Sequence, residues 1–109
     1  MLSQLINKQP AFFLNLCKTH KVSRLFAFGS SVHGPFNEKS DIDFVVDINE
    51  TDPINKGELL MSFWDKLELF FNRKVDLLTL NSIKNPVLKK NIEQTQQLVY
   101  DGQKQEILL

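Results

Sequence analysis

The sequence has little of several features that define whole classes of protein. It contains one cysteine, Cys17, which excludes an internal disulfide and a zinc site built from several cysteines. No apolar run approaches the roughly 20 residues that are needed to span a bilayer. The first residues lack both the basic and the long apolar part of a signal peptide. We therefore expect a cytoplasmic protein with no membrane partner.

Neither sign of charge is in excess, because 13 Lys and Arg residues balance 13 Asp and Glu residues. Nucleic-acid coat proteins and polybasic membrane binders carry a visible surplus of basic residues, so we expect no direct contact with nucleic acid. A chain of 109 residues with 42% hydrophobic content has the size and composition of an ordinary globular protein. We expect residues 1–109 to form a single domain.

The charges are distributed unevenly along the chain. Residues 1–40 hold five basic groups and one acidic group, and residues 53–109 hold eight basic and seven acidic groups. Residues 41–52 hold no basic group and five acidic ones, namely Asp41, Asp43, Asp47, Glu50 and Asp52. On charge alone, such an acidic block is typical of a solvated surface loop.

The apolar pattern predicts a small α/β or α+β domain. Apolar residues at three- and four-residue steps predict helices over 10–20, 56–72 and 86–96. Short apolar runs predict strands over 24–28, 41–48 and 75–80, and a short edge strand over 98–100. Arg73 and Lys74 are expected to close the second helix, where cations suit the helix dipole. The order of elements describes a small mixed sheet with helices packed against it.

Three features of this pattern could carry chemistry. Gly29-Ser30 follows a strand, and glycine allows the close backbone approach that lets amides and a hydroxyl hold phosphate oxygens. Asp41 and Asp43 point the same way from a strand, so their repulsion favours a cation such as Mg²⁺ between them. Asp76 lies inside an apolar strand, where a charge is costly without a partner. Taken singly, these features also describe a turn, a solvated strand face and an outward-facing strand position.

The spacing of the features is more specific than the features themselves. Ten residues separate Ser30 from Asp41, which gives the pattern G-S-x(10)-D-x-D. A chance match in a chain of this length is on the order of one in a thousand. With segments 25–30, 40–46 and 73–78, the sequence resembles the nucleotidyltransferase superfamily with the DNA polymerase β-type catalytic fold. Within it, the chain is most similar to the minimal nucleotidyltransferases (MNT, MntA-like), small partners of HEPN-domain proteins in prokaryotic toxin–antitoxin pairs.

The resemblance implies a reaction and the residues that perform it. AMP would pass from ATP, or another nucleoside triphosphate, to a hydroxyl group with release of pyrophosphate and with two Mg²⁺ ions as cofactors. The implied acceptor is a tyrosine of a cognate HEPN toxin, in a type VII-like toxin–antitoxin pair. The implied site residues are nucleotide-binding Gly29, Ser30 and Ser40, and catalytic, metal-binding Asp41, Asp43 and Asp76, of which Asp76 also orients or deprotonates the acceptor hydroxyl.

The chain departs from the family at Ser31 and His33, where many members carry basic residues that balance the triphosphate charge. Two other functions therefore stay open. One is a catalytically weak or inactive antitoxin that acts by binding alone. The other is a small-molecule nucleotidyltransferase of the aminoglycoside type, which normally needs additional substrate-binding structure. Because the catalytic domain is expected to occupy the entire chain, we expect a partner protein to complete the site. The apolar tail at 107–109 could dock on a partner protein or on a second copy in a homo-oligomer, although frayed or self-packed termini are commoner.

Overall fold

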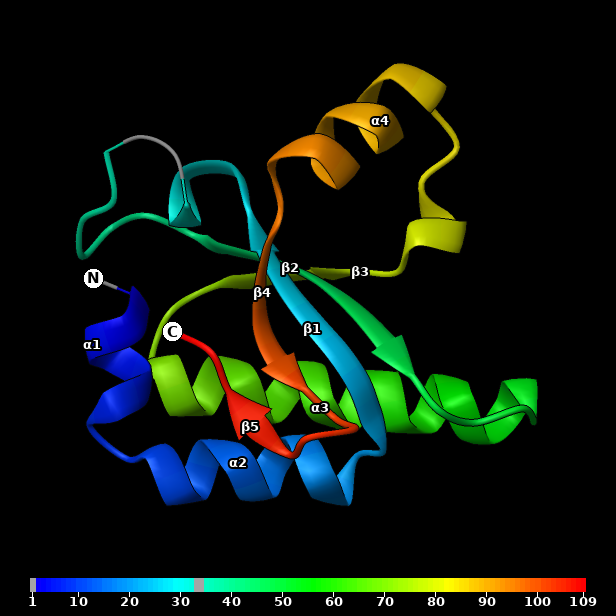
Figure 1. Ribbon diagram of the computed structural model, residues 1–109, viewed down its shortest axis with the longest axis horizontal. Helices are drawn as coiled ribbons and strands as arrows, with labels where there is room; N and C mark the ends of the chain where they lie inside the picture. The colour runs from blue at the N-terminus through cyan, green and yellow to red at the C-terminus, as the bar shows by residue number, and fades with distance from the viewer. Residues whose placement is uncertain (1, 33–34) are drawn as a thin grey trace.

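The computed structural model describes residues 2–32 and 35–109, so His33 lies outside the described residues. Its helices pack on both faces of a mixed sheet (Figure 1). The described helices are α1 (Leu2–Asn7), α2 (Pro10–Thr19), α3 (Pro53–Phe71) and α4 (Pro86–Thr95), with short 3-10 turns η1 (Gly29–Ser31) and η2 (Leu80–Ser82). The described strands are β1 (Val22–Phe28), β2 (Ile42–Ile48), β3 (Val75–Leu78), β4 (Gln97–Asp101) and β5 (Glu106–Ile107).

The strands are arranged in the order β3-β2-β1-β4-β5. β2 and β3 are parallel, because α3 carries the chain back across the sheet between them, and the other neighbours are antiparallel. This confirms the expected small mixed sheet with helices packed against it. The prediction of an edge strand at 98–100 is wrong, because β4 lies between β1 and β5. The chain reverses after β4, and Ile107 pairs with Tyr100.

Helix α3 begins and ends earlier than the apolar pattern predicted. It starts at Pro53, since the Asp52 carboxylate accepts a hydrogen bond from the Asn55 N–H at 3.4 Å and proline suits the first helical position. It ends at Phe71, because Asn72 adopts a left-handed conformation with φ 52° and ψ 45°. The prediction that residues 73 and 74 complement the dipole of this helix is therefore wrong, and both side chains have other contacts.

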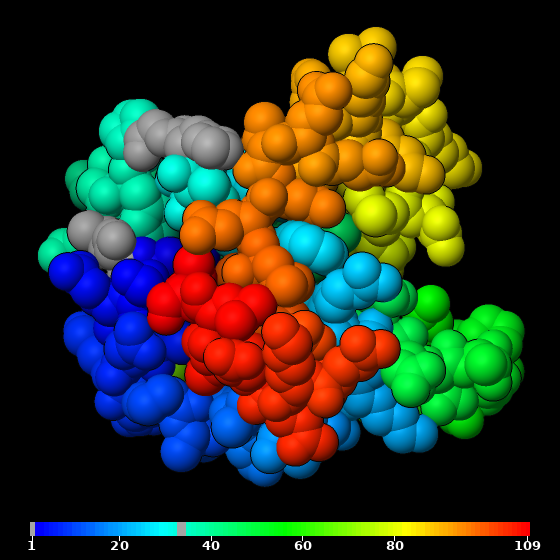
Figure 2. Space-filling view, in the orientation of Figure 1, coloured from blue at the N-terminus to red at the C-terminus, as the bar shows by residue number. Residues whose placement is uncertain are grey.

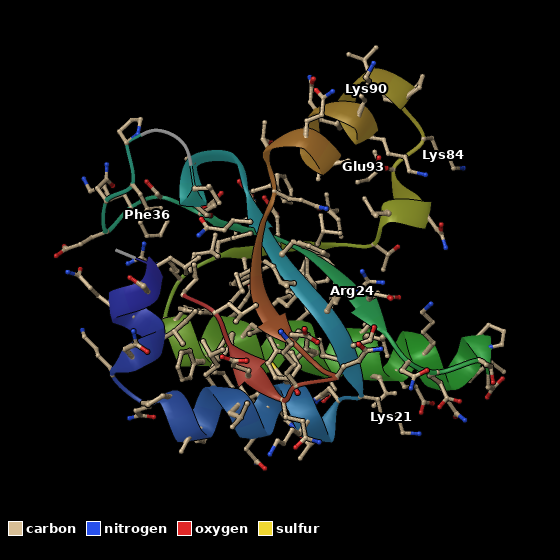
Figure 3. All side chains as sticks on the ribbon, in the orientation of Figure 1. Lys21, Arg24, Phe36, Lys84, Lys90 and Glu93 are labelled. Atoms are coloured by element: carbon tan, nitrogen blue, oxygen red, sulfur yellow. The ribbon has the colours of Figure 1, made fainter. Side chains whose placement is uncertain are left out.

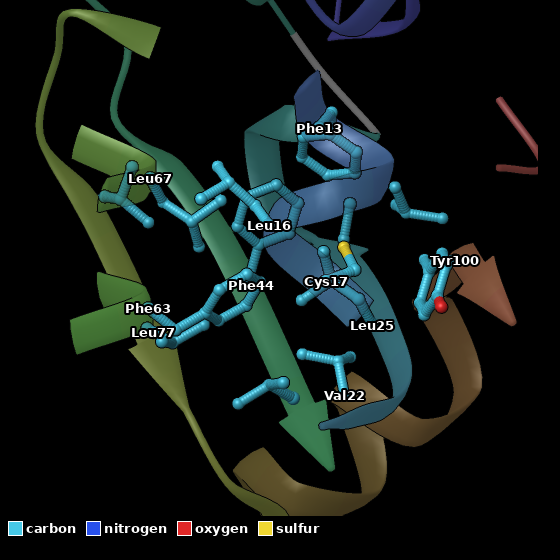
Figure 4. Packing of buried hydrophobic residues seen from close by; sticks show 14 of the residues in the cluster. Phe13, Leu16, Cys17, Val22, Leu25, Phe44, Phe63, Leu67, Leu77 and Tyr100 are labelled. Atoms are coloured by element: carbon cyan, nitrogen blue, oxygen red, sulfur yellow. The ribbon is translucent and has the colours of Figure 1, made fainter. Parts of the chain in front are cut away.

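The main hydrophobic core lies between the sheet and the layer formed by α2 and α3 (Figures 1 and 4). Alternation along β2 directs Phe44 and its even-numbered neighbours into this layer. Cys17 belongs to the core, and burial raises the pKa of its thiol to about 12, so the thiol is inert. His20 is also buried and lies 3.0 Å from the Ser62 hydroxyl through Nε2. We call the other face of the sheet, which α4 covers in part, the open face.

The C-terminal tail packs on the chain's own sheet. Ile107 lies in β5, and the Leu108 N–H donates to the Val99 carbonyl oxygen at 2.8 Å. Leu109 packs against the core as a partly buried residue. Within the described residues, no helix combines the length and the apolar character that a membrane span requires.

Candidate active site

Two carboxylates from different strands lie side by side on the open face. Ile42 and Phe44 of β2 are fully buried in the core, so Asp43 between them faces the opposite side and is half-buried. In the parallel register of β2 and β3, Asp43 lies opposite Asp76, which is also half-buried. Strand pairing thus brings together two of the three carboxylates that the sequence pattern singled out.

Burial and neighbouring negative charge disfavour the ionised form of Asp43. The pKa of Asp43 is raised from 3.8 to about 6, first by burial and then by the negative charge of Asp76. A hydrogen bond that protonated Asp43 shares with Asp76, and the charge of Asp41, act in the same direction, whereas Lys74 lowers the pKa. Like charges this close favour a bound cation or a proton. A carboxyl group whose pKa is shifted by burial and by a neighbouring charge is typical of functional sites.

Asp41 is more exposed than the other two and lies just before β2. Its Oδ2 atom is 4.0 Å from Nζ of Lys74, and both side chains are about half exposed or more. An ion pair of this kind contributes little to stability. Lys74 is therefore a cation at the edge of the carboxylate group, where the sequence prediction had placed a plain helix-end lysine.

Gly29 brings the backbone of η1 directly against Asp43. Its φ of +63° belongs to the left-handed region, which glycine adopts without a steric penalty. A Cβ atom at this position would stand 2.7 Å from Oδ2 of Asp43, closer than real Cβ contacts come. The approach is fixed by strand pairing, since Phe28 lies opposite Asp43 in the β1–β2 register. The sequence predicted a close approach at this glycine, and the structure identifies the atom that requires it.

The two serines that follow Gly29 have different environments. The Ser31 hydroxyl accepts a hydrogen bond from the Asp43 N–H at 3.0 Å and so ties η1 to the start of β2. Within residues 2–32 and 35–109, the Ser30 hydroxyl makes no hydrogen bond, which leaves it available to a ligand. The sequence marked Ser31 only as a missing basic residue. The hydrogen bond between Ser31 and Asp43 joins residues that are twelve positions apart, and no local sequence pattern predicts such a contact.

Ser40 shapes the loop that leads to Asp41. Its hydroxyl accepts a hydrogen bond from the Asn37 N–H at 3.1 Å. Arg73 fastens the same loop: its Nη1 atom donates to the carbonyl oxygens of Asn37 at 2.9 Å and of Ser40 at 3.2 Å, and its guanidinium lies 5.2 Å from the centre of the Phe36 ring. The described contacts of the Ser40 side chain are thus contacts within the loop. Arg73 holds the approach to the carboxylates in place.

Strand β3 is an edge strand, and α3 satisfies both backbone groups of its first residue, Val75. Trp64 Nε1 donates to the Val75 carbonyl oxygen at 2.6 Å, and the Val75 N–H donates to Oε2 of Glu68 at 3.0 Å. These two groups are therefore not available to pair with a further strand. Because Val75 directly precedes Asp76, the same two contacts hold the backbone next to Asp76 in place.

This arrangement predicts that Glu68→Leu destabilises the protein by about 1–3 kcal/mol, because the buried Val75 N–H loses its acceptor. Glu68→Gln is the matched control, since it keeps an acceptor oxygen at the same distance along the side chain. Urea denaturation should show the loss for the leucine variant and much less for the glutamine variant. Equal stability of the two variants would contradict the proposed role of this hydrogen bond.

The carboxylates are the type of ligand that a divalent metal prefers, but their side chains are not arranged as a complete metal-binding group in the described residues. Mg²⁺ prefers oxygen ligands and commonly takes one or two carboxylates together with substrate phosphates. The pKa of Asp43 is raised by burial and by the negative charges of Asp76 and Asp41, and a bound cation would offset both effects. Across residues 2–32 and 35–109, however, no three His, Cys, Asp or Glu side chains form a ready metal-binding group. The paired Asp43 and Asp76, with Asp41 beside them, offer oxygen ligands that a divalent metal could share with a substrate.

Comparison with known proteins gives the site a context. Residues 14–105 match the family model described as polymerase beta, nucleotidyltransferase. A Methanocaldococcus jannaschii protein named as a protein adenylyltransferase is 40% identical over 75 residues, which is 69% of this chain and 74% of that protein.

Solved structures share the fold. A toxin–antitoxin complex crystallised with AMP-PNP contains a chain that is 26% identical, with a TM-score of 0.60 over 84% of this chain and 73% of that one. A tri-AMPylated HEPN toxin of Shewanella oneidensis in complex with an MNT antitoxin matches at 24% identity, with a TM-score of 0.53 over 95% and 76% of the two chains. At that identity, the second likeness concerns the fold alone.

Proposed function

Because the chain belongs to the polymerase beta nucleotidyltransferase family and is therefore a nucleotidyltransferase, we propose that it transfers AMP from ATP to a hydroxyl group of a partner protein. The observation that carries the proposal is the pairing of Asp43 with Asp76 beside the Gly29 turn. A glycine turn that can receive phosphate and paired carboxylates that favour a cation are the two elements that nucleotidyl transfer requires.

Each site residue has a role in this proposal. The backbone of Gly29 and the hydroxyl of Ser30 hold the outer phosphates of the nucleotide, and Ser40 stays in the proposed nucleotide-binding set through the loop that it shapes. Asp76 orients the acceptor hydroxyl and takes its proton, since a carboxylate held in a strand at the site edge can act as a general base. Ser31 and Arg73 position these groups from outside the reacting atoms.

Asp41, Asp43 and Asp76 would hold the divalent metal, which we propose is Mg²⁺ in a two-metal site. When bound, the metal would supply charge neutralisation for the attacking and leaving oxygens of an in-line displacement. The contribution of the chain is to keep these carboxylates close despite their repulsion, through the β2–β3 register and the contacts of Val75 with α3.

For the acceptor we propose a tyrosine of a HEPN-domain toxin, which AMPylation would neutralise. Support comes from the names of the relatives, one a protein adenylyltransferase and one part of a toxin–antitoxin complex with a nucleotide analogue. Dependence on ATP is also consistent with a cytoplasmic location. Antitoxin action by binding alone is the second candidate, because Ser31 offers no positive charge to the triphosphate and its hydroxyl is engaged with the Asp43 backbone.

Incubation with α-labelled ATP, Mg²⁺ and the protein encoded by the adjacent gene tests the proposal. The partner protein should acquire label with the wild type and not with the Asp41→Asn, Asp43→Asn double variant. A folded wild type that labels no protein in the presence of metal would overturn the catalytic proposal. Undiminished neutralisation of the toxin by the double variant would favour binding alone, and labelling of an aminoglycoside without a partner would favour the small-molecule reaction.

A further inference from the structure

A cavity of about 450 Å³ opens on the open face of the sheet, between the sheet and α4. Its floor includes Phe26 and Val45, and its walls include Arg24 from β1, Asp47 from β2, and Glu93 and Gln96 from the end of α4 and the residue after it. Figure 2 shows the surface hollowed between the segment around η2 and the first turns of α3. In Figure 3, Arg24 and Glu93 lie on opposite sides of the space below α4.

The cavity lies on a definite side of the carboxylates. In the β1–β2 register, Phe28 pairs with Asp43, Phe26 pairs with Val45, and Arg24 pairs with Asp47. Val45 is two residues from Asp43, a separation of about 7 Å along a strand. Along β2, starting from the end beside Gly29, the carboxylates therefore come first and the cavity second. The carboxylates stand between the phosphate-binding turn and this hollow.

The order of turn, carboxylates and cavity is the order that an in-line displacement requires for leaving group, reacting phosphorus and attacking hydroxyl. The attacking oxygen must reach phosphorus from the side opposite the leaving group. If Gly29 and Ser30 hold the outer phosphates, pyrophosphate leaves toward that turn, and the acceptor hydroxyl enters from the side of the cavity. Strand β3 leads the same way, because Asp76 is followed by Thr79 and Leu80 in the cavity wall.

The cavity is lined by four charged residues, of which Arg24, Asp47 and Glu93 are exposed and Lys56 is half-buried. Arg24 and Lys56 supply positive charge and Asp47 and Glu93 supply negative charge, and within residues 2–32 and 35–109 none of these four side chains makes an ion pair or hydrogen bond. Oε1 of Gln96 is buried and likewise accepts no hydrogen bond there. Buried polar atoms are nearly always paired in complete structures, so a donor from a bound ligand or from an ordered water would satisfy this acceptor.

This lining fits a polypeptide better than a nucleotide. A triphosphate would meet two carboxylates, and an uncharged nucleoside would leave all four charged groups unused. A peptide offers backbone N–H donors for Gln96, charges of either sign for the rim, and apolar side chains for the floor at Phe26 and Val45. A pocket with an apolar floor and a few convergent polar groups is the usual form of a binding site.

We propose that this cavity, the acceptor groove, binds the segment of the partner protein that carries the acceptor hydroxyl. The assignment rests on the proposed function and adds to it the surface that selects the acceptor. The partner supplies the hydroxyl, and this chain supplies the groove that aims it at Asp76.

Steady-state labelling of the adjacent-gene protein tests the groove through two variants, Arg24→Glu and Gln96→Leu. Each should raise the KM for the acceptor protein at least about 10-fold, as expected for the loss of a well-placed interface contact. Each should leave the Kd for a non-hydrolysable ATP analogue within about 2-fold. Gln96→Glu keeps an acceptor oxygen and should restore most of the affinity. Lys66→Glu is the matched charge control, since Lys66 is exposed on α3 at the other face of the sheet.

A photo-cross-linking residue at Asn81 provides a readout that does not depend on transfer. Asn81 lines the groove, and its cross-link should map to the peptide of the partner that becomes labelled. A cross-linker at Leu69, which is 80% exposed on α3, should not reach that peptide.

The outcomes separate the two proposals. If the wild type transfers no label, the proposed function fails, and an Asn81 cross-link to the partner then decides whether the groove binds it. If transfer occurs but both groove variants behave like Lys66→Glu, the acceptor groove is wrong. A weaker Kd for the nucleotide analogue with an unchanged KM for the acceptor would assign the cavity to the nucleoside and overturn the proposal.

Discussion

Asp43→Asn is expected to slow nucleotide transfer on the order of 1,000-fold and, at the same time, to stabilise the metal-free protein. The loss of rate follows because the central carboxylate of the proposed site can no longer support a metal that contributes several kcal/mol to the transition state. The gain in stability follows because asparagine keeps the shape of the side chain and removes a charge that is costly to bury and is repelled by Asp76. A variant that loses activity while it gains stability distinguishes a functional residue from a structural one.

The stability gain should depend on pH in a definite direction. The pKa of Asp43 is about 6 in the folded chain against an ordinary value of 3.8, so the folded state binds this proton more tightly than the unfolded chain. The contribution of Asp43 to stability is therefore most favourable below pH 3.8 and is lost as the pH rises through about 6. The advantage of the asparagine variant should be full at pH 7.5 and should shrink toward pH 4.

Thermal unfolding with a chelator at several pH values measures this difference, and Asp65→Asn, an exposed change on α3, is the matched control. Added Mg²⁺ should raise the Tm of the wild type by mass action and leave that of Asp43→Asn nearly unchanged. An asparagine variant that is no more stable than the wild type at pH 7.5 without metal would contradict the predicted repulsion.

Gly29→Ala is expected to lower the transfer rate about 100-fold, an effect comparable with the loss of one preorganised group, and to destabilise the fold by about 1–2 kcal/mol. Two effects combine at this position. Alanine is strained at φ +63°, and its Cβ would stand 2.7 Å from Oδ2 of Asp43. The turn or the carboxylate must move, and either movement separates the proposed phosphate site from the proposed metal site.

Gly57→Ala is the matched control, because it makes the same substitution at a glycine that has neither a positive φ nor a close neighbour. Gly57 lies within α3, and a Cβ there would meet nothing within 4 Å. This change should stabilise the protein by about 0.5–1 kcal/mol, as alanine does inside a helix, and leave transfer unchanged. Chemical denaturation and initial-rate measurements on both variants check the pair. Full activity in Gly29→Ala would show that the close approach of the turn to Asp43 is dispensable.

The family, the fold class and the strand face on which Asp43 lies could be predicted because they depend on local sequence patterns. Alternation along a strand places Asp43 on the face opposite Ile42 and Phe44 whatever the strand pairs with. The glycine before Ser30 and the ten-residue interval to Asp41 are likewise properties of one continuous segment. Short-range rules are enough for such features.

The relations between segments depended on tertiary structure. The parallel register that places Asp76 beside Asp43, the hydrogen bond from the Asp43 amide to Ser31, and the support of Val75 by α3 join residues that are distant in the chain. The failed edge-strand prediction has the same origin, since only the return of the tail decides which strand is outermost. Strand partners are chosen by long-range packing and register, which no local spacing encodes. The sequence therefore determined which residues could act, and the fold alone decided which of them meet and where an acceptor could enter.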